Sequence, residues 1–261
     1  MASPITAPSL SLMKKKGEKI VCLTAYDASS AAMLDEAGVD VLLVGDSLGN
    51  VVQGGSTTLK VTLEEMAYHV RCVAGSVKRA LVVGDLPFGS YQESPEQAVR
   101  SSVALIKAGA AAVKLEGAYT EAITAIARAG IPVMGHAGMT PQSVHSFGGF
   151  KVQGKNSAAD RVLADCVAIQ DAGAFSLVLE LIPAELSAKI TQTLHISTIG
   201  IGAGPHCDGQ IQVWHDLLGL NSEIFKHAKA YLQGRSLMTK ALASYTEEVK
   251  SGVFPTEENS F

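Results

Sequence analysis

Apolar and polar positions alternate along the chain in repeated blocks, each of which predicts a helix followed by a strand. In four segments a helical pattern ends at Ala-Gly, continues through an apolar run and stops at a polar residue: 35–47, 106–118, 127–139 and 170–182. We expect a left-handed glycine after each of these helices, at Gly38, Gly109, Gly130 and Gly173. The apolar runs are nearly continuous rather than alternating, which is typical of parallel strands buried on both faces.

Four further segments fit strands of the same kind: 19–27, 79–90, 195–204 and 209–216. Helical patterns over 28–37 and 62–78, from near Pro183, and to about residue 251 separate or follow them. Eight strands that mostly alternate with helices favour a (β/α)8 TIM barrel over an open doubly wound sheet. The open sheet stays an alternative, although no Gly-x-Gly-x-x-Gly stretch joins the first strand to the first helix.

The length of 261 residues fits one barrel domain, with a loose N-terminal arm over 1–16 and a mobile tail over 252–261. A net charge of −4 gives no basic surface for nucleic acid, and no apolar stretch reaches the ~18 residues of a membrane span. The N-terminus lacks the apolar region of a secretory signal. Four scattered cysteines without a Cys-x-x-Cys pair predict buried, reduced thiols and a cytoplasmic location.

Ionisable residues stand at the ends of five successive predicted strands: Asp46 (followed by Ser47), Asp85, Lys114 with Glu116, His136 and Glu180. The C-terminal ends of the strands carry the active site in barrels of this kind. Lys114 and Glu116 are two positions apart, so a strand places both on one side and Val113 with Leu115 on the other. We therefore expect all these side chains to converge at one end of the barrel.

Each of these residues also has a structural interpretation. Asp46 and Asp85 could each cap a turn, and Glu180 could cap the helix near Pro183. Lys114 and Glu116 could form a structural ion pair inside the barrel, and buried pairs are weak sources of stability. His136 could be a hydrogen-bonded core histidine.

Carboxylates without cysteine or clustered histidine suit a hard cation, and Mg²⁺ leaves coordination positions for substrate oxygens. Such a site could bind a 2-oxo acid and stabilise its enolate. Lys114 would add positive charge where the enolate oxygen develops, and Glu180 would move the proton.

Seven stretches resemble one family in the same order, from about residue 17 to residue 250. They are TAYD (24–27), VGDSLGNVVQG (44–54), DLPFGSY (85–91), VKLEG (113–117), PVMGHAGMTPQSVHSFGGFKVQG (132–154), LVLELIPAEL (177–186) and TIGIGAGPHCDGQIQVWHDLLG (198–219). The family is 3-methyl-2-oxobutanoate (ketopantoate) hydroxymethyltransferase.

The resemblance implies a TIM barrel of the phosphoenolpyruvate/pyruvate type. It implies transfer of a hydroxymethyl group from 5,10-methylenetetrahydrofolate to 3-methyl-2-oxobutanoate, giving 2-dehydropantoate on the way to pantothenate and coenzyme A. Asp46, Asp85 and Glu116 resemble the Mg²⁺ ligands, Glu116 directly or through water. The ketoacid contacts are Asp46 and Ser47, with Asp85 and Lys114. Glu180 resembles the proton acceptor and His136 a site histidine.

The resemblance also implies a homo-oligomer, commonly a decamer, and does not identify the folate-binding residues. Three other hypotheses remain. A related Mg²⁺-dependent C–C or C–P lyase would act on a different acid, commonly with a catalytic cysteine on a mobile loop. A metal-free aldolase would use Lys114 as a Schiff-base nucleophile, although the adjacent Glu116 favours a charged ion pair. A non-catalytic scaffold would be expected to have lost some of the carboxylates.

Overall fold

The structure, a computed structural model, describes residues 3–223 and 225–261. Eight parallel strands form a closed barrel in sequence order, with β8 hydrogen-bonded to β1, which confirms the predicted (β/α)8 architecture. The strands are β1 (Ile20–Thr24), β2 (Val41–Val44), β3 (Leu81–Asp85), β4 (Ala112–Lys114), β5 (Val133–Gly138), β6 (Ser176–Glu180), β7 (Ser197–Ile201) and β8 (Gly209–Gln212).

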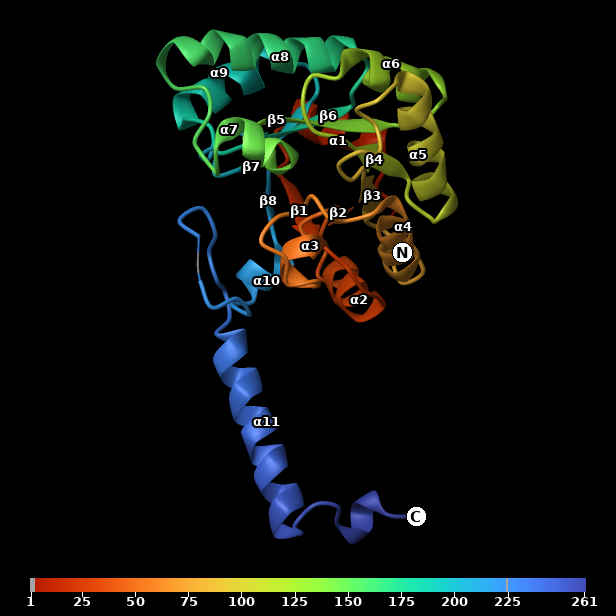
Figure 1. Cartoon of the computed structure of the whole chain (residues 1–261), viewed down its shortest axis with the longest axis vertical. Coiled ribbons are helices and arrows are strands. Elements are labelled where there is room, and N and C mark those ends of the chain that lie inside the picture. The colour runs from red at the N-terminus through yellow and green to blue at the C-terminus, as the bar shows by residue number, and fades with distance from the viewer. Residues whose placement is uncertain (1–2, 224) are drawn as a thin grey trace. The chain divides into compact units, whose positions relative to one another are not determined.

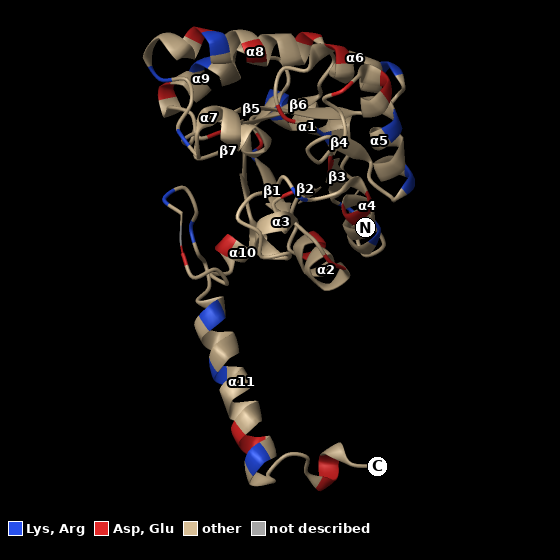
Figure 2. Ribbon diagram, viewed as in Figure 1, with Lys and Arg blue, Asp and Glu red and all other residues tan. Residues whose placement is uncertain are grey.

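Helices follow the strands and cover the outside of the ring, as α5, α6, α8 and α9 do in Figure 1. The barrel unit contains α1 (Ala7–Lys16), α2 (Ala28–Glu36), α3 (Leu48–Val51), α4 (Leu63–Ala74), α5 (Pro95–Lys107), α6 (Thr120–Arg128), α7 (Val144–Phe147), α8 (Ala159–Asp171) and α9 (Ala184–Thr193). Two 3-10 turns, η1 (Pro141–Ser143) and η2 (Asn156–Ala158), lie between β5 and α8. Both signs of charge occur on α5 and α6 (Figure 2).

Local sequence sets the helix ends. Thr62 and Glu65 form a capping box at the start of α4, in which each side chain bonds to the other residue's backbone N–H. At the Ser-Pro-Glu-Gln-Ala stretch, α5 begins at Pro95, with Ser94 as its N-cap. The four predicted left-handed glycines all have positive φ: Gly38, Gly109, Gly130 and Gly173.

Alternate strand residues fill the barrel interior. On β3, Leu81 and Val83 belong to the central core cluster, and Asp85 is the next residue of the same two-residue period. The same period continues from Ala112 on β4 to Lys114. It places the ionisable residues on the inner face at the C-terminal ends of the strands. The remaining strand residues of the cluster are Ile20, Cys22, Val41, Leu43, Met134, Val178, Ile199 and Ile211.

The expectation of a loose arm over residues 1–16 is wrong for the described part of that segment. Residues 7–16 form α1, and Leu10 is fully buried in the barrel's core cluster. Ser197 donates a hydrogen bond to the Leu10 carbonyl, and Lys14 donates to Asp208 at 2.9 Å. The weak amphipathic pattern of this polar segment concealed a helix that buries Ala7 and Leu10 and packs Met13 against the core cluster.

The chain divides into two compact units, which differs from the expected single domain over 1–261. The barrel unit ends at Val213, and the second unit covers Trp214–Phe261. The second unit contains α10 (Trp214–Leu217), α11 (Gly234–Ser251) and the 3-10 turn η3 (Glu257–Asn259), which lies within the predicted tail. Among the described residues, no helix combines the length and apolar character needed to cross a bilayer.

All four cysteines are free: Cys22, Cys166 and Cys207 are buried, and Cys72 is partly exposed. Burial raises the pKa of the Cys166 thiol to about 12, which makes it unreactive as a thiolate.

Candidate active site

The predicted site residues meet at the C-terminal end of the barrel. Asp46 and Ser47 follow β2, Asp85 ends β3, and Lys114 ends β4 with Glu116 two residues later. His136 lies within β5 and Glu180 ends β6. Asp46, Asp85, Lys114, Glu116 and His136 are each less than 5% exposed. This burial argues against the interpretation of Asp46 and Asp85 as simple turn caps.

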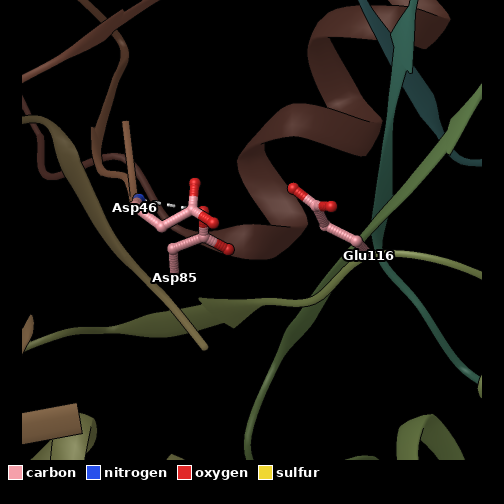
Figure 3. Close-up of side chains that lie close together, drawn as sticks. All are labelled: Asp46, Asp85 and Glu116. Atoms are coloured by element: carbon pink, nitrogen blue, oxygen red, sulfur yellow. Dashed lines mark hydrogen bonds between the residues drawn. The ribbon is translucent and has the colours of Figure 1, made fainter. Parts of the chain in front are cut away.

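Three of these side chains form a buried carboxylate cluster, Asp46, Asp85 and Glu116. One oxygen from each lies within 4.8 Å of the others. Figure 3 shows the three carboxylates around a shared space, approached from β2, β3 and the segment after β4. The backbone N–H of Asp46 donates to Asp85 Oδ2 at 3.3 Å, which holds the first two acids side by side.

Lys114 is the cation of the cluster. Its Nζ donates to both carboxylate oxygens of Asp85 at 2.8 Å and lies 3.6 Å from Glu116 Oε1. Burial alone would lower the pKa of Lys114, but Asp85, Glu116 and Asp46 raise it above its usual value. A charged ammonium is a poor Schiff-base nucleophile, so the structure does not favour the metal-free aldolase hypothesis.

His136 connects the carboxylate cluster to Glu180. Its Nδ1 lies 3.4 Å from Glu116 Oε1, and its Nε2 lies 3.4 Å from Glu180 Oε2. Burial would lower the pKa of His136, but the two carboxylates raise it to about 9. The imidazolium is therefore the second buried cation of the site, and the description of His136 as an ordinary core histidine is incomplete.

Glu180 differs from the other acids because its side chain is 15% exposed, so solvent or a ligand can reach it. It does not cap α9, whose N-cap is Pro183 without a side-chain hydrogen bond. The backbone turns sharply after it, since Leu181 has φ 46°. Strained residues of this kind cluster at functional sites. Gly138 pairs with Glu180, and a Cβ there would lie 2.3 Å from the Glu180 carbonyl oxygen.

The three clustered acids do not ionise equally. Burial and the carboxylates of Asp85 and Glu116 raise the pKa of Asp46 well above its usual value. Burial also raises the pKa of Asp85, although Lys114 opposes the increase. Burial would raise the pKa of Glu116 too, but Lys114 and His136 hold it below its usual value. Mutual repulsion is thus strongest at Asp46, where another cation would be most stabilising.

The residues fit a divalent metal ion. All three donors are carboxylate oxygens, the ligands that Mg²⁺ prefers. Glu116 Oε1 is buried and makes no hydrogen bond, with Lys114 Nζ at 3.6 Å and His136 Nδ1 at 3.4 Å as its nearest cations, whereas Glu116 Oε2 accepts from the Gln142 backbone at 2.9 Å. A buried carboxylate oxygen left in this state requires an explanation, and an ion in the shared space supplies one.

Ser47 lies at the start of α3, where its Oγ is 2.8 Å from Tyr26 Oη. The His69 ring, on α4, forms a hydrogen bond with the Tyr26 carbonyl at 2.7 Å. This bond holds the Tyr26 backbone in place beside Ser47. Tyr26 belongs to the Thr-Ala-Tyr-Asp stretch, but its contact with Ser47 was not predicted.

Gln142 and Tyr91 are the residues that sequence reasoning missed. Both are buried, and their side chains hydrogen-bond each other at 2.7 Å. Gln142 also bonds Asp46, and the Tyr91 hydroxyl contacts the Glu116 backbone. Gln142 falls in the Thr-Pro-Gln-Ser stretch, whose residues Pro141–Ser143 form η1. An uncharged side chain on a loop carried no signal of its own.

A family model described as ketopantoate hydroxymethyltransferase matches residues 4–257. The chain belongs to this family. A 3-methyl-2-oxobutanoate hydroxymethyltransferase of Methylococcus capsulatus is 50% identical over 265 aligned positions, covering 100% of this chain and 98% of the relative. The ketopantoate hydroxymethyltransferase prediction is confirmed, as is the prediction of an enzyme that transfers a hydroxymethyl group.

Solved structures share the barrel fold at low identity. A 2,3-dimethylmalate lyase, described as a PEP mutase/isocitrate lyase superfamily member, superposes with TM-score 0.64 at 17% identity, covering 100% of this chain and 93% of the lyase. A phosphonopyruvate hydrolase solved with oxalate and Mg²⁺ gives 0.65 at 10%, covering 98% and 93%. The predicted barrel fold is confirmed, and at these identities the likeness concerns the fold alone.

Proposed function

We propose that this hydroxymethyltransferase converts 3-methyl-2-oxobutanoate to 2-dehydropantoate, with 5,10-methylenetetrahydrofolate as the one-carbon donor. A proton leaves C3 of the ketoacid, and C3 forms a bond to the one-carbon unit. Water supplies the oxygen of the new hydroxyl group, and tetrahydrofolate is released. The full-length relative carries the name of this activity, and the buried carboxylate cluster beside Glu180 is the observation that supports the chemistry.

Asp46, Asp85 and Glu116 would hold Mg²⁺. When bound there, the ion supplies Lewis-acid stabilisation of the negative charge that develops on a 2-oxo acid. The four carboxylates of the site, Glu180 included, outnumber its two cations, Lys114 and His136, so a divalent cation would balance the charge. The phosphonopyruvate hydrolase of the same fold was solved with Mg²⁺ and oxalate, which supports a similar ion and a small acid at this end of the barrel.

Glu180 is the proton acceptor in this proposal. Its partial exposure distinguishes it from the buried carboxylates and leaves its oxygens accessible to C3. His136 would orient Glu180 through the 3.4 Å contact to Oε2. Lys114, fixed by Asp85, would present its positive charge to the ketoacid oxygens, and Ser47 with Asp46 would contact the same acid.

We include a homo-oligomer, a decamer by family resemblance, and a cytoplasmic location in the proposal. Within its own unit, α11 leaves Met238, Leu242, Tyr245 and Val249 exposed. Their three- and four-residue spacing forms one apolar stripe, which a second copy of the chain would cover. Sedimentation velocity of the full chain would test this, since a monomer at micromolar concentration would contradict it.

Hydrogen exchange at C3 of the ketoacid tests the base assignment without the folate. The enzyme should exchange this proton with D₂O in the presence of Mg²⁺, and EDTA should stop the exchange. We expect Glu180→Gln to slow exchange by about 10²-fold or more, in the usual range for a general base. Exposed Glu185→Gln on α9 is the matched control and should exchange like wild type. Equal exchange by Glu180→Gln would overturn the assignment.

A further inference from the structure

A hydrogen-bonded network surrounds one amide side chain behind the carboxylate cluster. Gln142 is 5% exposed and lies in η1, after β5, on a segment that supplies none of the three clustered acids. Its Nε2 donates to Asp46 Oδ2 at 2.9 Å, and its backbone N–H donates to Glu116 Oε2 at 2.9 Å. One residue thus contacts two of the three carboxylates, which come from different strands.

The rest of the Gln142 amide is also bonded. Nε2 donates a second hydrogen bond to the Leu86 carbonyl at 3.0 Å. Oε1 accepts from Tyr91 Oη at 2.7 Å and from Gln92 Nε2 at 3.2 Å. Both amide hydrogens and both lone pairs of the oxygen therefore have partners. This pattern fixes which end of the amide faces Asp46.

Tyr91 sets that orientation. Its hydroxyl oxygen accepts from the Glu116 backbone N–H at 3.2 Å. Its single proton has two acceptors, and Gln142 Oε1 at 2.7 Å is closer than the Glu116 carbonyl at 3.1 Å. Burial and the Glu116 charge raise the pKa of Tyr91 well above its usual value, so the hydroxyl stays a donor. The Tyr91 ring packs edge-to-face against Tyr119, with centroids 5.4 Å apart. The network runs without a gap from Tyr91 through Gln142 to Asp46.

We propose that Gln142 is a positioning residue for the metal ligands, held in register by Tyr91. It contacts Asp46 on one side and Glu116 on the other, so it sets the separation of two carboxylates that repel each other. Among the described residues, the Gln142 side chain is the one that donates a hydrogen bond to the Asp46 carboxylate. The hydrogen bond to Oδ2 restricts the rotation of the Asp46 carboxylate. This inference rests on the proposed function, because it assumes that the cluster holds Mg²⁺.

Calorimetric titration with MgCl₂ tests the inference on the full-length enzyme stripped with EDTA. Gln142→Met keeps the side-chain length and the backbone N–H bond to Glu116, and it removes the hydrogen bonds of the side-chain amide. We expect its Kd for Mg²⁺ to rise about 10–100-fold with unchanged stoichiometry, the usual effect of removing a partner of a metal ligand. Tyr91→Phe should weaken binding in the same direction by a smaller factor. The apparent KM for Mg²⁺ should rise in turnover assays, while kcat at saturating Mg²⁺ changes less.

Gln170→Met is the matched control. Gln170 Oε1 accepts from the His195 backbone at 2.7 Å, next to the N-terminal end of β7 and away from the carboxylate cluster. This variant should lose thermal stability and keep the wild-type Kd. A purely structural role for Gln142 would have the same signature, with lower stoichiometry or melting temperature and an unchanged Kd, and would overturn the inference.

The two proposals fail differently. If wild type binds Mg²⁺, Asp46→Asn abolishes binding and Gln142→Met binds like wild type, the positioning role is wrong and the metal site stands. If wild type gives no binding heat by calorimetry and no Mg²⁺-dependent exchange, the metal site is wrong and the positioning role falls with it. If circular dichroism shows that Gln142→Met is unfolded, Tyr91→Phe decides, and a wild-type Kd in that variant overturns the inference.

Discussion

The Nζ atom of Lys114 lies 2.8 Å from both carboxylate oxygens of Asp85, and neither side chain is more than 3% exposed. The two residues are direct neighbours on β4 and β3. Burying such a pair contributes little net stability, but removing one partner leaves an unpaired buried charge. Lys114 pairs with Asp85 and His136 lies beside Glu116, which leaves Asp46 as the carboxylate most exposed to repulsion in the absence of a metal ion.

We therefore expect Lys114→Met to lower the free energy of unfolding in EDTA by ~3–5 kcal/mol, the usual cost of breaking a buried ion pair. Chemical denaturation followed by circular dichroism measures this change. Lys189→Met is the control, because its 3.9 Å contact with Asp160 lies on the surface. Such exposed pairs contribute ~0–1 kcal/mol. Equal losses of unfolding free energy in the two variants would show that breaking the buried Lys114–Asp85 pair costs no more than breaking a surface pair.

Asp46 predicts proton release when Mg²⁺ binds. Burial and the two neighbouring carboxylates raise the pKa of Asp46 well above its usual value, which favours the protonated carboxyl group. A cation that binds there must displace this proton. Raised carboxyl pKa values mean that Mg²⁺ affinity falls as pH decreases. Calorimetry in two buffers with different ionisation enthalpies should give different apparent binding enthalpies at the same pH.

Glu116→Gln is the control for proton release, because Glu116 is the clustered acid whose pKa is lowered. Glu116→Gln should weaken Mg²⁺ binding but retain the buffer-dependent enthalpy in any binding that remains, since burial and Asp85 still act on Asp46. Binding enthalpies of wild type that do not change with the buffer would contradict the assignment of a raised pKa to Asp46.

His136 predicts a second pH effect, on stability. Its contacts with Glu116 and Glu180 raise its folded pKa to about 9, above the usual 6.5. A raised histidine pKa gives stability that is fully present below about pH 6.5 and is lost as pH rises through about 9. Urea denaturation in EDTA should show this decline in wild type and a smaller one in His136→Gln. Exposed His195→Gln should retain the wild-type decline, and a His136→Gln variant with that same decline would refute the prediction.

Sequence patterns predicted the barrel and most of the site for identifiable reasons. Parallel strands are apolar on both faces, so the charges of Lys114 and Glu116 stood out against their neighbours. Once the strand was identified, the two-residue period determined which side Lys114 faces, and the structure pairs it with Asp85. The same period applies to His136 and Glu180, whose 3.4 Å contact links them. The convergence of the five strand ends follows from barrel closure.

What the sequence did not predict depends on loops and on weak local signals. Gln142 is uncharged and follows a loop proline, so neither periodicity nor charge marked it, and only the packing of η1 behind Asp46 reveals its partners. The expected ion pair of Lys114 with Glu116 is present only at 3.6 Å, because Asp85 on the adjacent strand is closer. Pairing between strands depends on register, which the strand pattern leaves open.

The helix over residues 7–16 offers a last test, because the sequence predicted a loose arm over residues 1–16. Leu10 is fully buried in the barrel core, whereas Leu12 on the same helix is 52% exposed. Leu10→Ala should lower the free energy of unfolding by ~2–5 kcal/mol, as large-to-small changes in cores do. Leu12→Ala, with the same change in composition, should stay within ~0.5 kcal/mol of wild type. Thermal and urea denaturation of both variants measure the difference. Equal stability would mean that α1 does not contribute to the core in solution.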